Sequence, residues 1–477
     1  MTRYVVSTKP TSIVSDSREV TKGALFLAYP GANSDGRDYI ADAISKGACA
    51  VLWEPKGFDW DESWDVENTP VVNLKQQAGV IADQFYNSPS AKMWAIGVTG
   101  TNGKTSVTQW LGQCLNAIGK KTAVIGTLGN GLPDQLSDTV NTTPDAIVLQ
   151  NLLAGYVQEG VEALAMEVSS HGIHQGRVKG MQFDVAVMTN LSRDHLDYHG
   201  SYEKYAAVKA RLFATGGLKH AVLNSDDVFS EQVQEKLAET DVNVLTYGIS
   251  SGDVRASKVY LEDGRINFFV TTPFGQSDVS ANLIGRFNVY NVLAVLATLL
   301  VSDVPLIEAV EAIAHIQPLS GRMQTFGGHD IPLVVVDYAH TPDSLKNVLL
   351  ALREQTKQRL ICVFGCGGNR DQGKRAMMGK VASELADAVV VTSDNPRDEK
   401  PEDIIQAVLA GVKGEYAVEE DRGKAIAIAI ESAKAEDIVL VAGKGHEDYQ
   451  EIEGQKQHFS DVEQVEKALK RYEVEVA

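Results

Sequence analysis

Residues 94–106 read WAIGVTGTNGKTS, an apolar run followed at once by glycines, a lysine and hydroxyl side chains. Glycines let the backbone approach an anion closely, N–H groups at the start of a helix face it, and Lys104 neutralises charge. The common phosphate-binding motif has a further glycine five residues before its Gly-Lys pair, where this chain has Val98. The segment still predicts a strand, a phosphate-binding loop and a helix; an ordinary strand-to-helix turn is the alternative. The loop residues are Gly100, Thr101, Asn102, Gly103, Lys104, Thr105 and Ser106.

Length and charge limit the classes of protein that this sequence can specify. A chain of 477 residues is too long for one hydrophobic core, so about two to four domains are expected. A net charge of -19 argues against nucleic-acid binding. The four cysteines are too sparse for a disulfide framework. Neither a signal-peptide segment nor a membrane-spanning run is evident. We therefore expect a cytoplasmic, monomeric protein that acts on small molecules, without a nucleic-acid or membrane partner.

Apolar runs alternate with helical patterns along the chain, which predicts an α/β protein with mostly parallel sheets. We expect three domains: a small α/β unit over 1–88, a central phosphate-loop domain over 89–317, and a Rossmann-like domain over 318–477. The expected strands are 24–28 and 50–53 in the first domain, 163–168 and 185–189 in the second, and 333–336, 360–364, 388–392 and 438–442 in the third.

Polar residues follow two strands of the central region at the point where each strand ends. Glu167 closes one apolar run, and Asn190 closes the next, with His195 shortly after it. The carboxyl ends of parallel strands lie on one edge of a sheet, so these residues are expected beside the phosphate loop. A carboxylate, an imidazole and the Thr105 hydroxyl suit Mg²⁺. The alternatives are a helix cap or surface carboxylate for Glu167, and a hydrogen-bonded loop histidine for His195.

The third region repeats this arrangement. Asp337 and the polar or glycine-rich segments 365–371, 393–397 and 443–447 each follow an expected strand. Together they predict a second ligand surface facing the first, so that an ATP-like ligand lies in the central domain and another substrate is completed by the third. Taken singly, Asp337 could be a turn residue, and the arginines of these segments could be solvated.

In their order along the chain, these motifs resemble the Mur ligase family, the ATP-dependent amino-acid ligases of peptidoglycan precursor synthesis. The resemblance covers almost the whole chain. Its motifs are GTNGKT at 100–105, EVSSH at 167–171, NLSRDH at 190–195, GRFNVYN at 285–291, GRM at 321–323 and DYAHTP at 337–342. SDSR at 15–18, GANSDGR at 31–37 and NTTP at 141–144 are similar to the branch that adds the third residue to UDP-N-acetylmuramoyl-L-alanyl-D-glutamate.

The resemblance implies a role for many single residues. Nucleotide contacts would come from the phosphate loop and from Asn288, Asn291, Arg322, Asp337 and His340. The UDP-linked substrate would meet Ser15, Ser17, Ala32, Asn33, Ser34, Asn141, Thr142, Thr143, Ser169, Gln175 and Arg177. Mg²⁺ would be held by Thr105, Glu167, His195 and Lys209, the last as a carbamate. The catalytic residues would be Lys104, Glu167, His195 and Lys209. From the residues alone, Lys209 is a solvated helix lysine, and Gln175 and Arg177 are surface residues.

The sequence DNPR at 394–397 resembles the family members that use meso-diaminopimelate, whereas those that use L-lysine usually carry another residue in place of Arg397. An arginine can bind the distal carboxylate of diaminopimelate on two nitrogens. The implied amino-acid site is Arg370, Asp394, Asn395, Pro396, Arg397, Gly443 and Glu447. The family reaction passes through an acyl phosphate on the D-glutamate γ-carboxylate. Alternatives are the same reaction with lysine, a folylpolyglutamate-type ligase, and a nucleotide hydrolase or switch without ligation.

Overall fold

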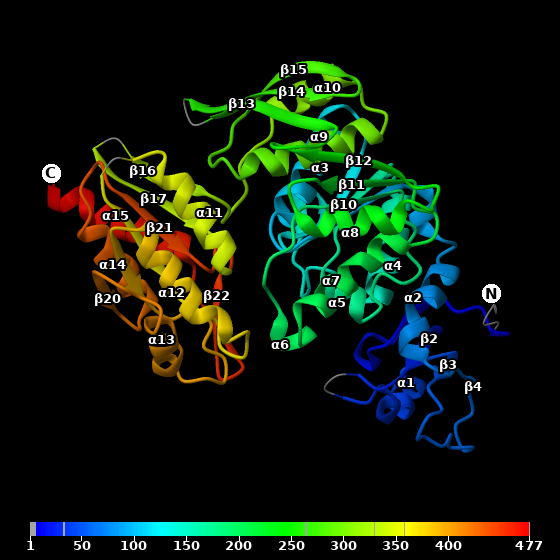
Figure 1. Cartoon of the computed structure of the whole chain (residues 1–477). Coiled ribbons are helices and arrows are strands. Elements are labelled where there is room, and N and C mark those ends of the chain that lie inside the picture. The colour runs from blue at the N-terminus through cyan, green and yellow to red at the C-terminus, as the bar shows by residue number, and fades with distance from the viewer. Residues whose placement is uncertain (1–5, 32–33, 263–264, 329, 357, 477) are drawn as a thin grey trace.

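The computed structural model describes residues 6–31, 34–262, 265–328, 330–356 and 358–476. Figure 1 shows three bodies in chain order, with the N-terminal and C-terminal bodies each beside the central one. Each body is built around its own sheet. The expected α/β architecture is confirmed. No helix in the described ranges combines the length and the apolar character needed to cross a membrane.

The N-terminal body has, in the part described, a parallel sheet in the order β1-β2-β3-β4. Alternate side chains of β2 enter two small cores: Leu25 packs on the side of α2, and Phe26 on the side of α1. This is the two-residue period of a strand covered on both faces. The elements are β1 Ser12–Val14, η1 Ser17–Glu19, β2 Ala24–Ala28, η2 Gly36–Tyr39, α1 Ile40–Ser45, β3 Ala50–Trp53, β4 Glu67–Pro70, α2 Leu74–Phe85 and η3 Pro89–Lys92.

The central body holds a mixed sheet, which among the described residues has the order β15-β14-β13-β12-β11-β10-β5-β9-β6-β7-β8. Its middle, from β13 to β6, is parallel, and both edges are antiparallel. The strands are β5 Trp94–Thr99, β6 Thr122–Gly126, β7 Gly129–Leu132, β8 Gln135–Ser137, β9 Ala163–Glu167, β10 Val185–Met188, β11 His220–Asn224, β12 Asn243–Gly248, β13 Val254–Glu262, β14 Arg265–Thr272 and β15 Gly275–Ala281.

Helices cover both faces of this central sheet. On one face α3 and α9 bury Val107 and Val292 in a common core, and on the other α4 and α7 bury Leu149 and Val208. The helices are α3 Lys104–Ala117, α4 Ala146–Gln158, α5 Ser170–His174, α6 Leu196–His199, α7 Tyr202–Ala210, η4 Arg211–Ala214, α8 Val228–Leu237, α9 Asn288–Val301 and α10 Leu306–Ala314.

The C-terminal body has a sheet of order β16-β17-β21-β18-β19-β20 in its described residues, parallel except for β16. Its cores place α11, α12 and α13 on one face and α14 and α15 on the other. The elements are β16 Gln324–Gly328, β17 Ile331–Asp337, α11 Pro342–Arg353, β18 Leu360–Phe364, α12 Gly373–Leu385, β19 Ala388–Val391, α13 Pro401–Leu409, β20 Tyr416–Val418, α14 Arg422–Glu431, β21 Ile438–Ala442, β22 Tyr449–Ile452, β23 Gln455–His458 and α15 Asp461–Val476.

Strand register places the loops of interest on shared sheet edges. In the central body Thr99 pairs with Met188 and Val98 with Glu167, so β5, β9 and β10 end together. In the C-terminal body Asp337 pairs with Ala442, which in turn pairs with Phe364. The loops that follow β17, β18, β19 and β21 therefore leave one edge of that sheet, as the sequence predicted.

Candidate active site

A cavity of about 970 Å³ lies where the central and C-terminal bodies meet. Loops of both bodies line it, so residues far apart in the sequence share one space. The sequence-predicted residues in its lining are Thr101, Asn102, Gly103, Lys104, Thr105, Ser106, Asn141, Thr142, Thr143, Glu167, Ser169, Arg177, His195, Lys209, Asn288, Asn291, Arg322, Asp337, His340 and Arg370. The cavity thus joins the predicted nucleotide site to part of the other two predicted sites.

The phosphate loop has the conformation that its glycines allow. Gly100 has a φ of 149° and Gly103 a φ of 83°, and a Cβ on Gly103 would collide with Asn291. Val98 is fully buried inside β5, two residues before the turn begins. Val98 therefore stands inside the strand at the place of the missing motif glycine, and the turn that follows keeps Gly100 and Gly103.

Lys104 lies at the first turn of α3 and folds over its own loop. Its Nζ donates to the carbonyl oxygens of Gly100 at 3.0 Å and Thr101 at 2.8 Å. Burial lowers the pKa of Lys104, and the nearby carboxylates of Glu167 and Asp194 oppose this shift. A half-buried cation whose only hydrogen-bond partners are carbonyl oxygens is a good partner for phosphate.

Glu167 is only 1% exposed at the end of β9. Its Oε2 accepts a hydrogen bond from Thr105 Oγ1 at 3.1 Å, and its Oε1 accepts one from the Thr127 amide at 2.7 Å. Arg322 Nη2, from the C-terminal body, donates to the same Thr105 oxygen at 3.1 Å. The carboxylate is therefore neither a helix cap nor a surface group: those alternatives for Glu167 are wrong.

The oxygen ligands beside the phosphate loop fit Mg²⁺. Mg²⁺ usually takes one or two carboxylates and completes its shell with phosphate oxygens and water. Within the described ranges, His, Cys, Asp and Glu side chains form no group of three or more suited to hold a metal. Glu167 and the Thr105 hydroxyl, 3.1 Å apart, are thus a donor set for a metal ion that arrives with a nucleotide.

Lys209 is 1% exposed on α7, so its interpretation as a solvated helix lysine is wrong. Its Nζ donates to the Gly100 carbonyl at 2.6 Å and lies 4.8 Å from the centre of the Tyr205 ring. Burial lowers the pKa of Lys209 well below its ordinary value, and the charge of Lys104 adds to this shift. The periodicity of the sequence gave no signal of this burial.

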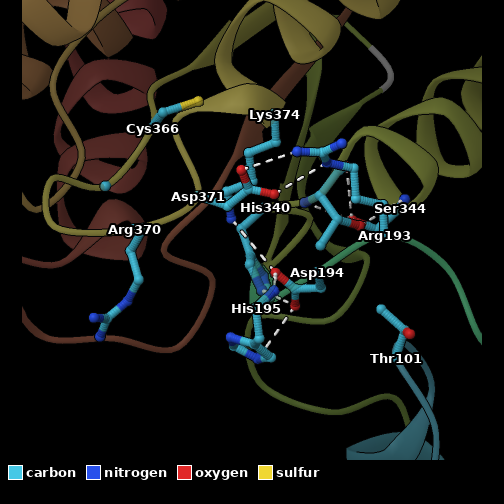
Figure 2. Close-up of polar contacts among 12 residues, drawn as sticks. Thr101, Arg193, Asp194, His195, His340, Ser344, Cys366, Arg370, Asp371 and Lys374 are labelled. Carbon is cyan, nitrogen blue, oxygen red and sulfur yellow. Dashed lines mark hydrogen bonds and ion pairs between the residues drawn. The ribbon is translucent and has the colours of Figure 1, made fainter. Parts of the chain in front are cut away.

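Asp194 connects the two bodies at the cavity, a contact that sequence reasoning missed (Figure 2). Its carboxylate lies 3.3 Å from His195 Nε2 and 3.8 Å from both His340 Nε2 and Lys374 Nζ. Burial alone would raise the pKa of Asp194, but the imidazole of His340 and the charge of Lys374 hold it well below its ordinary value. Burial also lowers the pKa of His195 to about 3, so this imidazole is neutral.

The predicted amino-acid residues form a second group at the ends of β19 and β21. Asn395 Nδ2 donates to Glu447 Oε2 at 2.9 Å, and the fully buried Lys444 donates to both side chains at 3.1 Å. Gly443 has a φ of 122°, where a Cβ would meet Asp394 Oδ2 at 2.8 Å. Lys444 was missed, because one lysine in a loop carries no sequence signal of burial.

This second group adjoins the cavity without forming its wall. The cavity wall, as far as the structure describes it, includes Arg370 and none of the other predicted amino-acid residues, which are Asp394, Asn395, Pro396, Arg397, Gly443 and Glu447. Arg370 is exposed, and its Nη1 donates to the Asn369 carbonyl at 3.1 Å. The two predicted arginines therefore occupy different positions, one in the wall and one beyond it.

Some of the residues predicted for the UDP-linked substrate lie in the cavity wall, and others lie outside it. In the wall, Thr143 Oγ1 donates to the Glu167 carbonyl at 2.8 Å, and Arg177 Nη1 donates to the Thr143 carbonyl at 2.7 Å. Gln175 Oε1 accepts from Arg177 Nε at 3.0 Å and is not itself part of the described wall. The predicted residues of the N-terminal body, Ser15, Ser17 and Ser34, do not line the cavity among the described residues, and Ala32 and Asn33 lie outside them.

Comparison with known proteins gives family matches along most of the chain. Residues 10–86 match the catalytic domain of the Mur ligase family, 98–299 its middle domain, and 321–445 its glutamate ligase domain. A Chromobacterium violaceum protein named UDP-N-acetylmuramoyl-L-alanyl-D-glutamate--2,6-diaminopimelate ligase is 50% identical over 461 residues, which is 96% of this chain and 94% of that protein.

Solved structures with the same architecture include one of a ligase with that same name. It superposes with a TM-score of 0.70 at 35% identity, over 97% of this chain and 95% of that one. The MurF ligase from Thermotoga maritima in complex with ADP superposes with a TM-score of 0.69 at 18% identity, over 99% of this chain and 100% of that one. At that identity the second likeness establishes the fold alone.

Proposed function

The chain belongs to the Mur ligase family, and we propose that it joins meso-2,6-diaminopimelate to the D-glutamate γ-carboxylate of UDP-N-acetylmuramoyl-L-alanyl-D-glutamate, converting ATP to ADP and phosphate. The observation that carries this proposal is one cavity lined by the phosphate loop of the central body and by Arg322, Asp337 and His340 of the C-terminal body. The cluster around Asn395 and Glu447 lies next to it. This arrangement fits two substrates that must meet after one has been activated.

The chemistry explains why ATP is needed. A carboxylate is a poor acyl donor because its oxygen is a poor leaving group. In the proposed first step a γ-carboxylate oxygen bonds to the γ-phosphorus of ATP and ADP leaves. The amine of diaminopimelate then attacks the acyl carbon and loses a proton, and the C–O bond to phosphate breaks. The protein supplies alignment and stabilises negative charge.

Two basic residues are positioned to stabilise that charge. Lys104 already lies over the phosphate loop, and Arg322 reaches the Thr105 hydroxyl from the opposite body. The guanidinium of Arg322 also lies 4.4 Å above the Tyr338 ring, which fixes its orientation. We assign Lys104 and Arg322 to the transferring phosphoryl group, because both cations lie beside the phosphate loop, where they can stabilise negative charge on the phosphate oxygens.

We assign the metal ligands to Thr105, Glu167, neutral His195 and Lys209 as a carbamate. Bound Mg²⁺ would neutralise charge on the phosphate oxygens. A neutral imidazole is the ligand form of histidine, and the buried amine of Lys209 favours the uncharged state that adds CO₂ to give a carbamate anion. Glu167 and Thr105 lie at hydrogen-bond distance from each other and support this assignment.

The remaining assignments stay predictions. We propose that 1–88 binds the UDP portion, 89–317 the ATP, and 318–477 the amino acid, in a monomeric cytoplasmic enzyme. Asn288 and Asn291 near the phosphate loop, with Nδ2 of Asn291 donating to Oδ1 of Asn288 at 2.9 Å, support a nucleotide contact on α9.

The test is a substrate-competition assay. The purified protein is mixed with ATP, Mg²⁺, the UDP-linked dipeptide and either meso-diaminopimelate or L-lysine, and both phosphate and the ligated product are measured. We expect product with diaminopimelate and little with lysine. Equal rates with both amino acids would remove the selectivity argument. Phosphate release that needs no amino acid would favour a nucleotide hydrolase.

A further inference from the structure

Arg397 has an uncommon backbone conformation that a neighbouring hairpin holds in place. Its φ is 54°, in the left-handed region that residues other than glycine rarely adopt. The Arg397 amide donates to the Glu451 carbonyl at 2.9 Å, and the Glu453 amide donates to the Arg397 carbonyl at 2.8 Å. The hairpin of β22 and β23, 449–458, thus pairs with the DNPR loop by main-chain bonds, although the two are separated by more than a whole helix–strand unit.

The same hairpin also holds the Arg397 side chain. Arg397 Nε donates to Glu451 Oε2 at 3.1 Å, and Nη1 donates to the Gly368 carbonyl at 3.0 Å. Both charged side chains are partly buried, with 17% of Arg397 and 26% of Glu451 exposed. Within the described residues Nη2 makes no hydrogen bond, so it is the nitrogen left to a ligand. The Glu451 amide further donates to Asn395 Oδ1 at 2.9 Å, which ties a second predicted amino-acid residue to the hairpin.

Resting on the function proposed above, we propose that Glu451 is a positioning residue for amino-acid selectivity. It fixes the guanidinium of Arg397 so that Nη2 faces the distal carboxylate of diaminopimelate. Without it, the long arginine side chain would sample several rotamers and would lose that freedom on binding. L-lysine has no distal carboxylate, so its binding gains nothing from an ordered Arg397. Glu451 therefore acts on the preference between the two amino acids and leaves the nucleotide site unaffected.

Three variants separate this role from a general effect on the fold. Glu451→Ala removes the acceptor of Arg397 Nε. Glu451→Gln removes the charge but keeps an oxygen that accepts the same bond. Glu453→Ala is the matched control, because Glu453 is an exposed residue of the same hairpin and its carboxylate makes no hydrogen bond or ion pair with the described residues. Alanine keeps the backbone amide in each case. Thermal unfolding of all three checks that they fold.

Steady-state kinetics of ligation give the readout. We expect Glu451→Ala to raise the KM for diaminopimelate about tenfold and to narrow its preference over lysine by a similar factor. The KM values for ATP and for the UDP-linked dipeptide should stay within about twofold. Glu451→Gln should stay within about threefold of the wild type, and Glu453→Ala should match it. In an Arg397→Ala background, loss of Glu451 should have no further effect.

The outcomes distinguish this inference from the proposed function. A wild-type protein that forms no product with diaminopimelate overturns both. An active wild type with an unchanged Glu451→Ala variant, or with equal losses in Glu451→Ala and Glu453→Ala, overturns the inference alone. A parallel rise in the KM for ATP also overturns it. If Glu451→Ala unfolds, Glu451→Asp shortens the side chain and keeps the charge; an unchanged KM for diaminopimelate in that variant overturns the inference.

Discussion

The ion pair between Arg193 and Asp371 joins the central body to the C-terminal body, and its removal should slow ligation by a calculable amount. Arg193 Nε and Nη2 donate to the two carboxylate oxygens of Asp371 at 3.1 and 3.2 Å (Figure 2). Arg193 is two residues before His195, and Asp371 directly follows Arg370. The pair therefore ties a loop of the predicted metal site to a loop of the predicted amino-acid site.

The exposure of the pair sets the size of the effect. The Arg193 side chain is 42% exposed and that of Asp371 is 9% exposed. Exposed ion pairs contribute about 0.2–1 kcal/mol to the free energy of the contact they make. This pair lies near the upper end, because Arg193 binds the carboxylate through two nitrogens. A loss of about 1 kcal/mol lowers about fivefold the ratio of molecules in which the central and C-terminal bodies are in contact to those in which they have separated. If ligation needs the two bodies in contact and the separated arrangement predominates in solution, kcat/KM should fall by the same factor.

A double-mutant cycle measures this coupling. Arg193→Ala and Asp371→Asn should each lower kcat/KM about fivefold, and the double variant should be no worse than either. Asparagine keeps the acceptor that Asp371 Oδ1 offers to the Gly373 amide at 2.9 Å. The loss of kcat/KM relative to wild type should shrink at high salt, because the charge of the half-exposed Arg193 is screened. Glu384→Gln, which removes an exposed partner 3.7 Å from Lys380, is the control and should change nothing.

Independent losses that multiply to about 25-fold in the double variant would refute the coupling. Losses that persist unchanged in high salt would show that the two residues act by another route. A fall in kcat/KM with only one of the two single variants would assign the effect to that residue's other contacts.

Two further predictions concern buried charges. Lys209→Ala should lose most ligation activity and regain part of it with added short-chain carboxylates, if a carbamate on this fully enclosed lysine is the working group; the absence of any recovery contradicts that assignment. Arg422 Nε lies 2.7 Å from Asp461 Oδ1, and both side chains are 0% exposed. Asp461→Ala therefore leaves the guanidinium of Arg422 buried without its counter-ion. It should cost about 3–5 kcal/mol in the unfolding free energy of the C-terminal body, measured by hydrogen exchange in β19 and β21, and a loss below about 1 kcal/mol would contradict the argument.

The buried parallel strands could be predicted from the sequence almost to the residue. β2 spans Ala24–Ala28 and β18 spans Leu360–Phe364, as expected. Strands covered on both faces read as continuous apolar runs, and the glycine or polar residues that follow mark their ends. The antiparallel edge of β13, β14 and β15 was not predicted. In β14 buried and half-buried residues alternate, a weaker signal because only one face is packed.

The residues of the candidate site differ in how far the sequence alone could place them. The phosphate loop and Glu167 could be placed from local pattern, because a strand and its following loop are continuous in the chain. Most other assignments depended on the family resemblance. Contacts such as Arg193 with Asp371 and Arg397 with Glu451 join residues 178 and 54 positions apart. A single sequence does not state which loops meet, since that depends on how the bodies pack against each other and, within one body, on how its strands are ordered.

In this acidic chain, two lysines of the predicted phosphate site lie against one backbone carbonyl. Lys104 and Lys209 both donate to the Gly100 carbonyl, at 3.0 and 2.6 Å. Burial of Lys209 lowers the pKa of its amine, and repulsion by the charge of Lys104 adds to this shift. A phosphate group that draws Lys104 toward itself would leave the Gly100 oxygen to Lys209 alone. If phosphate binds there, the state of the predicted carbamate lysine would thereby be coupled to occupation of the loop through one carbonyl. A net charge of -19 over the whole chain has no bearing on this coupling, because a few buried atoms determine it.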